Sequence, residues 1–138
     1  MKYALWLLVF CTLLLAPALS EVPPLSPEMQ AQQSSHILIG RVLKVEAAGT
    51  ESPGDYPNLI FRVTLRVLDV VKGDGLKSQE ELTFTYWQAG KRPPGWVGPG
   101  GQYQEVPADT VVRVYLTKEK TGYRLLSPNG WEKTEGKS

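Results

Sequence analysis

The chain has 138 residues, with 15 Lys and Arg against 14 Asp and Glu, one histidine and one cysteine. This length suits a single domain with a modest hydrophobic core. The balanced charge supplies no basic field that would attract nucleic acid or an anionic membrane. We therefore expect no nucleic-acid partner.

The first twenty residues have the pattern of a secretory signal peptide. A lysine at the second position precedes an apolar run over residues 4–15, and the small residues Ala18 and Ser20 follow it. A retained membrane anchor is the alternative, but the run is shorter than the roughly 20 residues that a spanning helix needs. We expect cleavage near Ser20 and Glu21, and a mature protein that is secreted or periplasmic and not attached to a membrane.

Removal of residues 1–20 from the 138-residue chain leaves 118 residues with equal numbers of acidic and basic side chains, and it also removes Cys11. Small secreted animal domains usually carry disulfides, so their absence indicates a bacterial envelope protein held together by its core. Without a mature cysteine, neither a Cys/His metal cluster nor a Cys–His nucleophile pair can form. The chain has no nucleophile-elbow motif to accompany the lone His36, which is expected to be a structural or surface residue. We expect no catalytic residue, metal or cofactor.

Residues 21–35 are expected to form a leader and a short surface helix. Ser26 is a typical N-cap, Pro27 is favoured at the first helical position, and Glu28 places an acid in the first turn.

The most regular segment of the chain is residues 59–67. Apolar side chains alternate there with Ile60, Arg62, Thr64 and Arg66, which is the period-two pattern of a half-buried strand. The expected inward set is Leu59, Phe61, Val63, Leu65 and Val67. The alternation then slips, so we expect a β-bulge or bend at Leu68 and Asp69 before the strand ends at Gly73.

Four further strands are expected, at residues 36–46, 81–88, 111–117 and 123–127. Gly40 within the first strand indicates a bulge or a close backbone approach. Residues 47–58 are expected to form a mobile loop, 127–131 a turn and 132–138 a disordered tail. The pattern predicts an all-β domain with a small α contribution, built as an antiparallel barrel or sandwich over residues 36–131.

The long irregular segment at residues 89–110 is the best candidate for function, because loops of this length are uncommon unless they are functional or disordered. Aromatic and cationic side chains that stack on sugars or peptides gather in it and at its start. The candidate binding residues are Trp87, Lys91, Arg92, Trp96 and Tyr103, with Trp87 expected to be exposed. In the alternative interpretation, Trp96 and Val97 fold back as a lid over the open end of the barrel.

Two segments resemble the netrin-like modules of the tissue inhibitors of metalloproteinases and their bacterial relatives. They are Ile-Leu-Ile-Gly-Arg-Val at residues 37–42 and Val-Leu-Asp-Val-Val-Lys-Gly at residues 67–73. The resemblance covers residues 36–88 and, more loosely, 111–127, and it implies a five-stranded antiparallel OB-like barrel. The inhibitors place an N-terminal cysteine on the protease zinc and carry disulfides. The mature chain has neither, so zinc-directed inhibition is not carried over.

These patterns together predict an exported, non-enzymatic binding or interaction module with a protein or glycan partner in the envelope. One alternative is a protease-inhibitor-like protein that acts through the 89–110 loop. Another is an enzyme with an unrecognised carboxylate site.

Overall fold

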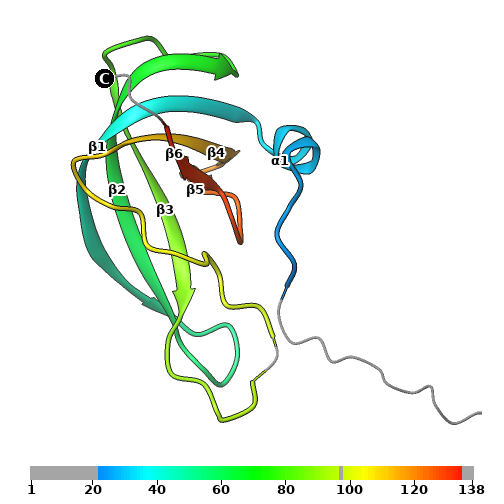
Figure 1. Cartoon of the computed structure of the whole chain (residues 1–138). Helices are drawn as coiled ribbons and strands as arrows, with labels where there is room; N and C mark the ends of the chain where they lie inside the picture. The colour runs from blue at the N-terminus through cyan, green and yellow to red at the C-terminus, as the bar shows by residue number, and fades with distance from the viewer. Residues whose placement is uncertain (1–21, 97, 135–138) are drawn as a thin grey trace, which may run out of the picture.

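The computed structural model describes residues 22–96 and 98–134. The expected signal peptide, Val97 and residues 135–138 lie outside that part. One helix precedes six strands (Figure 1). They are α1 (Pro27–Gln33), β1 (His36–Glu51), β2 (Asn58–Lys72), β3 (Glu81–Ala89), β4 (Val111–Glu119), β5 (Gly122–Leu125) and β6 (Trp131–Lys133).

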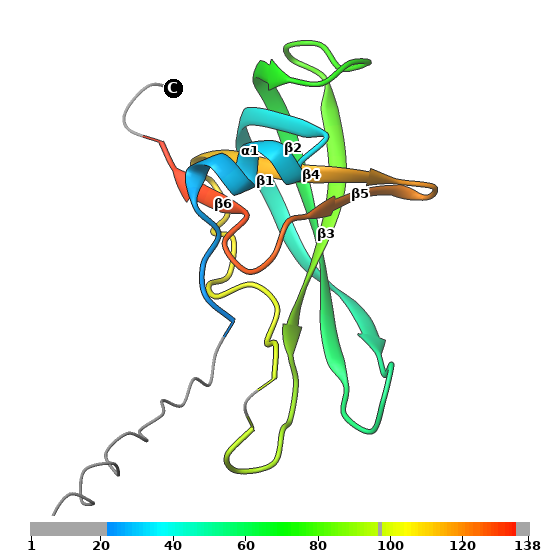
Figure 2. The ribbon, with the colours of Figure 1, turned by 90° about the vertical axis from the view of Figure 1, so that its right-hand side faces the viewer.

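Five of the strands pair in a ring. Their order is β1-β2-β3-β5-β4, and β4 pairs back with β1, while β6 adds to the other side of β4. Figure 2 shows β4 and β5 crossing β2 and β3 at a steep angle. The expected all-β class is confirmed, but the expectation of wholly antiparallel pairing is wrong, because β3 and β5 run parallel. The long segment between β3 and β4 returns along β3 before β4 begins, so the β4–β5 hairpin is placed with β5 parallel to β3.

The sixth strand corrects the expected tail. The sequence predicts a disordered tail from residue 132, but Glu132 pairs with Arg113 in β6, and the Thr134 amide donates to the Val111 carbonyl at 3.1 Å. The Trp131 side chain packs against the core at the start of this strand. A strand of three residues is too short for an alternation that sequence could reveal.

The core lies inside the ring and follows the predicted face of β2 for most of its length. Val63, Leu65 and Val67 are fully buried. The pairing with β1 skips Leu68, since Gly40 faces Val67 and the next β1 residue back faces Asp69. The predicted bulge is therefore confirmed.

Leu59 was expected in the core and is instead 38% exposed. The reason is that β1 continues to Glu51, which pairs with Asn58, so the expected loop shortens to residues 52–57. Since β4 pairs with β1 only as far as Arg41, the rest of β1, β2 and β3 extends beyond the ring as a three-stranded arm. Leu59 pairs with Thr50 near the end of this distal arm and is not part of the core cluster.

The helix is capped at both ends, and the N-cap is the predicted one. Ser26 Oγ accepts from the Met29 amide at 3.1 Å. At the other end, Lys72 Nζ donates to the carbonyls of Ala31 and Ser34, both at 2.7 Å. A cation here satisfies carbonyls that the helix leaves without partners. The lysine at the end of β2 therefore fixes α1 to the ring.

Replacing Lys72 by methionine is expected to lower the free energy of unfolding by about 1 kcal/mol, because two helical carbonyls lose a charged donor. Lys120→Met, in the exposed β4–β5 turn, is the matched control and should change stability less. Urea unfolding of both variants measures this, and equal losses would contradict the capping role.

His36 is buried and hydrogen-bonded, which matches the structural rather than the surface option of the expectation. Its Nε2 lies 2.9 Å from the Asp74 carbonyl and its Nδ1 lies 2.9 Å from Ser35 Oγ. Its ring packs edge-on against Tyr123. A side chain at Gly73 would collide with the imidazole, which explains glycine at this point.

The buried phenols of Tyr86 and Tyr115 make the stability of the fold depend on pH in the alkaline range. Burial raises the pKa of Tyr86 above its ordinary value of 10.0, while the hydrogen bond from the Val106 amide lowers it and Glu105 raises it again. Burial likewise raises the pKa of Tyr115, to which Glu132 adds. Since the folded state holds these protons more tightly, the stability they contribute is present below the ordinary value and is lost as pH rises above it.

The free energy of unfolding should therefore fall between about pH 9 and about pH 11, and it should fall less in a Tyr86→Phe/Tyr115→Phe variant. Denaturant unfolding at both pH values measures the two slopes. Equal slopes would show that these phenols do not account for the alkaline loss.

Candidate ligand-binding groove

Three hollows lie next to one another in a row that begins at the distal arm and ends at β6, with volumes of about 390, 360 and 510 Å³. The first and second share Trp87, Trp96 and Pro99. The second and third share Gln102, Tyr103 and Pro128. The second hollow is therefore the middle one of a row, which we call the aromatic groove.

The middle hollow is formed where the 89–110 loop returns along β3. The Ala89 amide donates to the Gly100 carbonyl and the Gln102 amide to the Trp87 carbonyl, both at 2.9 Å. Gly101, between them, has φ +80°, and a side chain there would collide with the Trp87 backbone. Glycine is thus required for the loop to lie against this strand.

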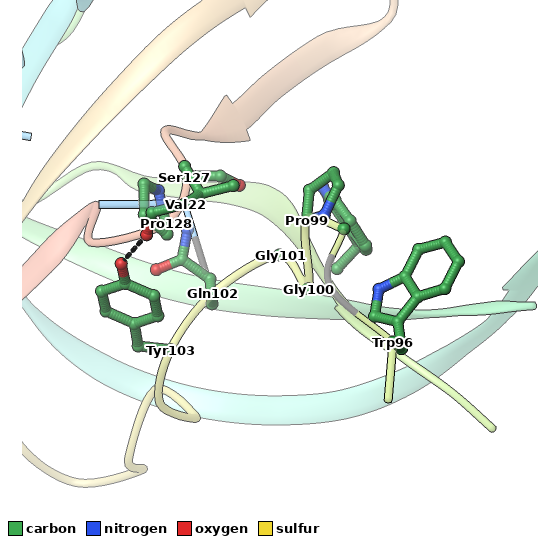
Figure 3. Close-up of a pocket in the computed structure, with 11 residues that line it drawn as sticks. Val22, Trp96, Pro99, Gly100, Gly101, Gln102, Tyr103, Ser127 and Pro128 are labelled. Atoms are coloured by element: carbon green, nitrogen blue, oxygen red, sulfur yellow. Dashed lines mark hydrogen bonds between the residues drawn. The ribbon is translucent and has the colours of Figure 1, made fainter. Parts of the chain in front are cut away.

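The Gln102 side chain joins this loop to the turn before β6. It is 4% exposed, donates from Nε2 to the Leu126 carbonyl at 2.5 Å, and accepts from the Gly130 amide at Oε1 at 3.2 Å. The next amide, of Tyr103, donates to the Pro128 carbonyl at 2.9 Å. Two segments that are distant in sequence thus form one rigid wall. Figure 3 shows Tyr103 at one end of the middle hollow and Trp96 at the other.

Arg92 holds the first hollow in shape. Its Nη1 donates to the Pro57 carbonyl at 2.6 Å and its Nη2 to Asn58 Oδ1 at 2.5 Å. The guanidinium carbon lies 5.2 Å from the centre of the Trp96 ring, and Tyr56 meets the same ring edge-on at 6.0 Å. Arg92 therefore packs against the Trp96 ring and helps to orient it. Its guanidinium group is at the same time hydrogen-bonded to Pro57 and Asn58.

Four of the five residues singled out in the sequence line the groove. Trp87, Trp96 and Tyr103 line the middle hollow, and Arg92 lines the first. Lys91 is exposed beside them and is not among the lining residues. Trp87 is partly buried rather than exposed, because residues 100–102 pair along its strand edge.

Val106, rather than Trp96, is the residue of the 89–110 loop that packs in the core. Trp96 is 42% exposed and lies outside the core. Val106 from the same loop enters it instead, at 3% exposed, with its amide donating to the Tyr86 hydroxyl at 3.3 Å. The lid interpretation is therefore wrong for Trp96, and Val97 lies outside the described residues.

Sequence reasoning missed the Gln102 wall and the side of the groove formed by Pro128 and Asn129. The signal available was the Ser-Pro-Asn-Gly turn, which predicts a turn but not its neighbour across the fold.

Charge is confined to the two end hollows. Asp55 and Arg92 line the first, and Glu132 and Lys133 line the third, so each end carries one acid and one base. The middle hollow is lined by no charged side chain among the residues that the structure describes. The groove therefore favours a ligand without strong net charge.

Residues 22–96 and 98–134 contain no group of three or more His, Cys, Asp or Glu side chains placed to hold a metal ion. Within the same residues, no helix has the length and apolar character to cross a membrane.

Comparison of the chain with protein-family models, curated proteins and solved structures found no match in any of the three.

Proposed function

We propose that this protein is an exported, non-enzymatic binding module that holds an extended, uncharged ligand in the aromatic groove. The observation that carries the proposal is the row of three hollows with shared aromatic walls and an uncharged middle. A row suits a chain-like ligand such as a polypeptide or a glycan better than a compact metabolite, because successive units occupy successive hollows.

The chemistry of the walls supports binding rather than catalysis. Trp96 offers an indole that Arg92 and Tyr56 already hold in place, so little side-chain entropy is lost when a ligand stacks on it. General acid–base catalysis needs a titratable group within hydrogen-bond reach of the reacting atoms. The Tyr103 hydroxyl in the middle hollow is already used, since it donates to the Val22 carbonyl.

The fold and compartment belong to the same proposal. We infer that the five-strand ring is an OB-like barrel of the netrin-like type, supported by the strand order and by the two matching segments. Export is supported by the pattern of residues 1–20 and by the lack of any cysteine after Cys11. N-terminal sequencing of the mature protein should begin at Glu21, and a retained Met1 would contradict export by cleavage.

The experiment is a direct screen of the purified mature chain against peptide and glycan arrays. We expect Trp96→Ala to reduce retention at least tenfold, because it removes the shared wall of two hollows. Val71→Ala is the matched control, since this exposed apolar residue lies on β2 outside the lining of the three hollows. Equal loss in both variants, or none in Trp96→Ala, would contradict binding in the groove.

The protease-inhibitor alternative makes a different prediction. An inhibitor would insert the 89–110 loop into the active-site cleft of a protease. The amount of protease captured would then follow the fraction of protease molecules whose active site is free. A blocked active site would then abolish the capture.

A further inference from the structure

The residues just before α1 occupy part of the groove in a defined way. Figure 3 shows the Tyr103 hydroxyl directed at Val22, and the hydrogen bond is to its carbonyl. Three residues later, Leu25 forms a pair of hydrogen bonds with the Asn129 amide. Its amide donates to Oδ1 at 2.9 Å, and its carbonyl accepts from Nδ2 at 3.0 Å. We call residues 22–25 the leader.

The spacing of these contacts has a physical meaning. The two residues between Val22 and Leu25 are Pro23 and Pro24, which fix φ near −65° and keep the residue before each of them extended. A proline-rich segment of this kind adopts a polyproline II helix with three residues per turn. Positions three apart then lie on the same edge, and these are the two positions whose backbone groups the groove contacts.

The contacts are made to backbone atoms, so they would serve another sequence of the same shape. Tyr103 donates to a carbonyl, and Asn129 satisfies the amide and carbonyl of one residue. Asn129 is itself held, since its carbonyl accepts from Gln30 Nε2 at 2.7 Å. Aromatic-lined grooves with hydrogen-bonding side chains at this spacing are a general mode of recognition for proline-rich peptides. The hydroxyl groups of a sugar ring do not reproduce the backbone amide and carbonyl of a single residue that Asn129 satisfies.

We propose that the aromatic groove recognises an extended, proline-containing segment of a protein partner, and that the leader is a built-in competitor for the same track. This inference rests on the proposed function and names its ligand class. Val22 forms part of the wall of the middle hollow, so departure of the leader would open that hollow toward Asn129. A partner segment would then run from the Asn129 contact past Tyr103 toward Trp96.

The probe is the dye-labelled peptide acetyl-Glu-Val-Pro-Pro-Leu-Ser-amide, and the readout is fluorescence anisotropy with the mature chain. In a Pro23→Gly/Pro24→Gly variant the leader is more flexible and pays more entropy to dock, so its competition is weaker. We expect the peptide to bind this variant about tenfold more tightly than it binds the parent. A peptide with glycine in place of both prolines should bind at least about tenfold less tightly.

Two further variants, made in the loosened-leader background, locate the site. Asn129→Ala should abolish peptide binding. Tyr103→Phe keeps the exposed ring, removes only the hydroxyl, and should weaken binding about fivefold. If circular dichroism shows that the Asn129→Ala protein is unfolded, the Tyr103→Phe variant alone decides the result.

Equal affinity of the peptide for the parent and the loosened-leader variant would overturn the proposal, as would equal affinity of the proline and glycine peptides. A parent that sediments as a dimer and becomes a monomer in the loosened-leader variant would also overturn it, because the groove would then hold the leader of a second copy. Failure of these tests while Trp96→Ala still loses an array ligand would leave the binding module standing and remove only the peptide assignment.

Discussion

Replacing Gly40 by alanine is expected to lower the free energy of unfolding by about 2–3 kcal/mol. A Cβ at this position would lie 2.6 Å from the Arg66 carbonyl oxygen and 2.7 Å from Leu65 Cγ. Gly40 also pairs on both edges, with Val67 of β2 and Val112 of β4, so the backbone cannot shift away without breaking the ring. Overpacking at a closed point of the sheet therefore has no easy relief.

The control for this prediction is Gly54→Ala in the β1–β2 turn. An added Cβ there meets no atom within 4 Å, so stability should change by less than about 0.5 kcal/mol. Urea unfolding followed by circular dichroism compares the two variants. A loss at Gly40 no larger than that at Gly54 would show that the ring does not close tightly at β1.

Gln102→Ala is expected to lower the free energy of unfolding by about 3 kcal/mol and to abolish ligand retention. It leaves the Leu126 carbonyl and the Gly130 amide without their partners, and each unsatisfied buried group costs about 1–3 kcal/mol. The loss also leaves the 89–110 loop joined to the turn before β6 through the Tyr103 amide and the Pro128 carbonyl without the two Gln102 bonds, so the wall of the middle hollow is less firmly fixed. Stability and binding should fall together.

Gln104→Ala is the matched control, because this glutamine is exposed and lies in the same loop. Its backbone carbonyl still accepts from Trp131 Nε1 after the substitution. Because Gln104 also lines the third hollow, this variant is a control for stability alone, and we expect little change in unfolding. A Gln102→Ala protein that unfolds like Gln104→Ala would contradict the role of the buried amide as the join between the two segments.

Local chemistry made most of the ring predictable. The alternation in residues 59–67 identified β2, the slip at Leu68 identified its bulge, and Ser26 with Pro27 identified the start of α1. Each of these signals depends on residues that are close in sequence. A period-two pattern therefore predicts a strand with one buried face from local sequence alone.

The features that were missed depend on contacts across the chain. Leu59 alternates like the core residues, yet it lies in the distal arm, and its exposure depends on where β4 stops pairing with β1. The parallel pairing of β3 with β5 is decided by the path of a long loop. The sequence within a strand therefore predicts neither the exposure of Leu59 nor the parallel pairing of β3 with β5.

The candidate site was partly predictable for the same reason. Aromatic residues in a long loop pointed to Trp96 and Tyr103, which do line the middle hollow. The opposite wall comes from Pro128, which is distant in sequence and meets the loop through the bonds of Gln102 to Leu126 and Gly130 and of the Tyr103 amide to Pro128. Lys91 and Arg92 look alike in sequence, but only Arg92 is oriented toward Trp96 by Pro57 and Asn58.

The most direct test of the central claim is nuclear magnetic resonance of the mature chain with the peptide or glycan that it retains from the arrays. Residues 21–138 contain three tryptophans, Trp87, Trp96 and Trp131, and each lines a hollow of the groove. We predict that the ligand shifts the indole resonances of Trp87 and Trp96 and leaves the amides of the β4–β5 turn in place. Shifts confined to that turn, with all three indoles unmoved, would contradict a binding module built around the aromatic groove.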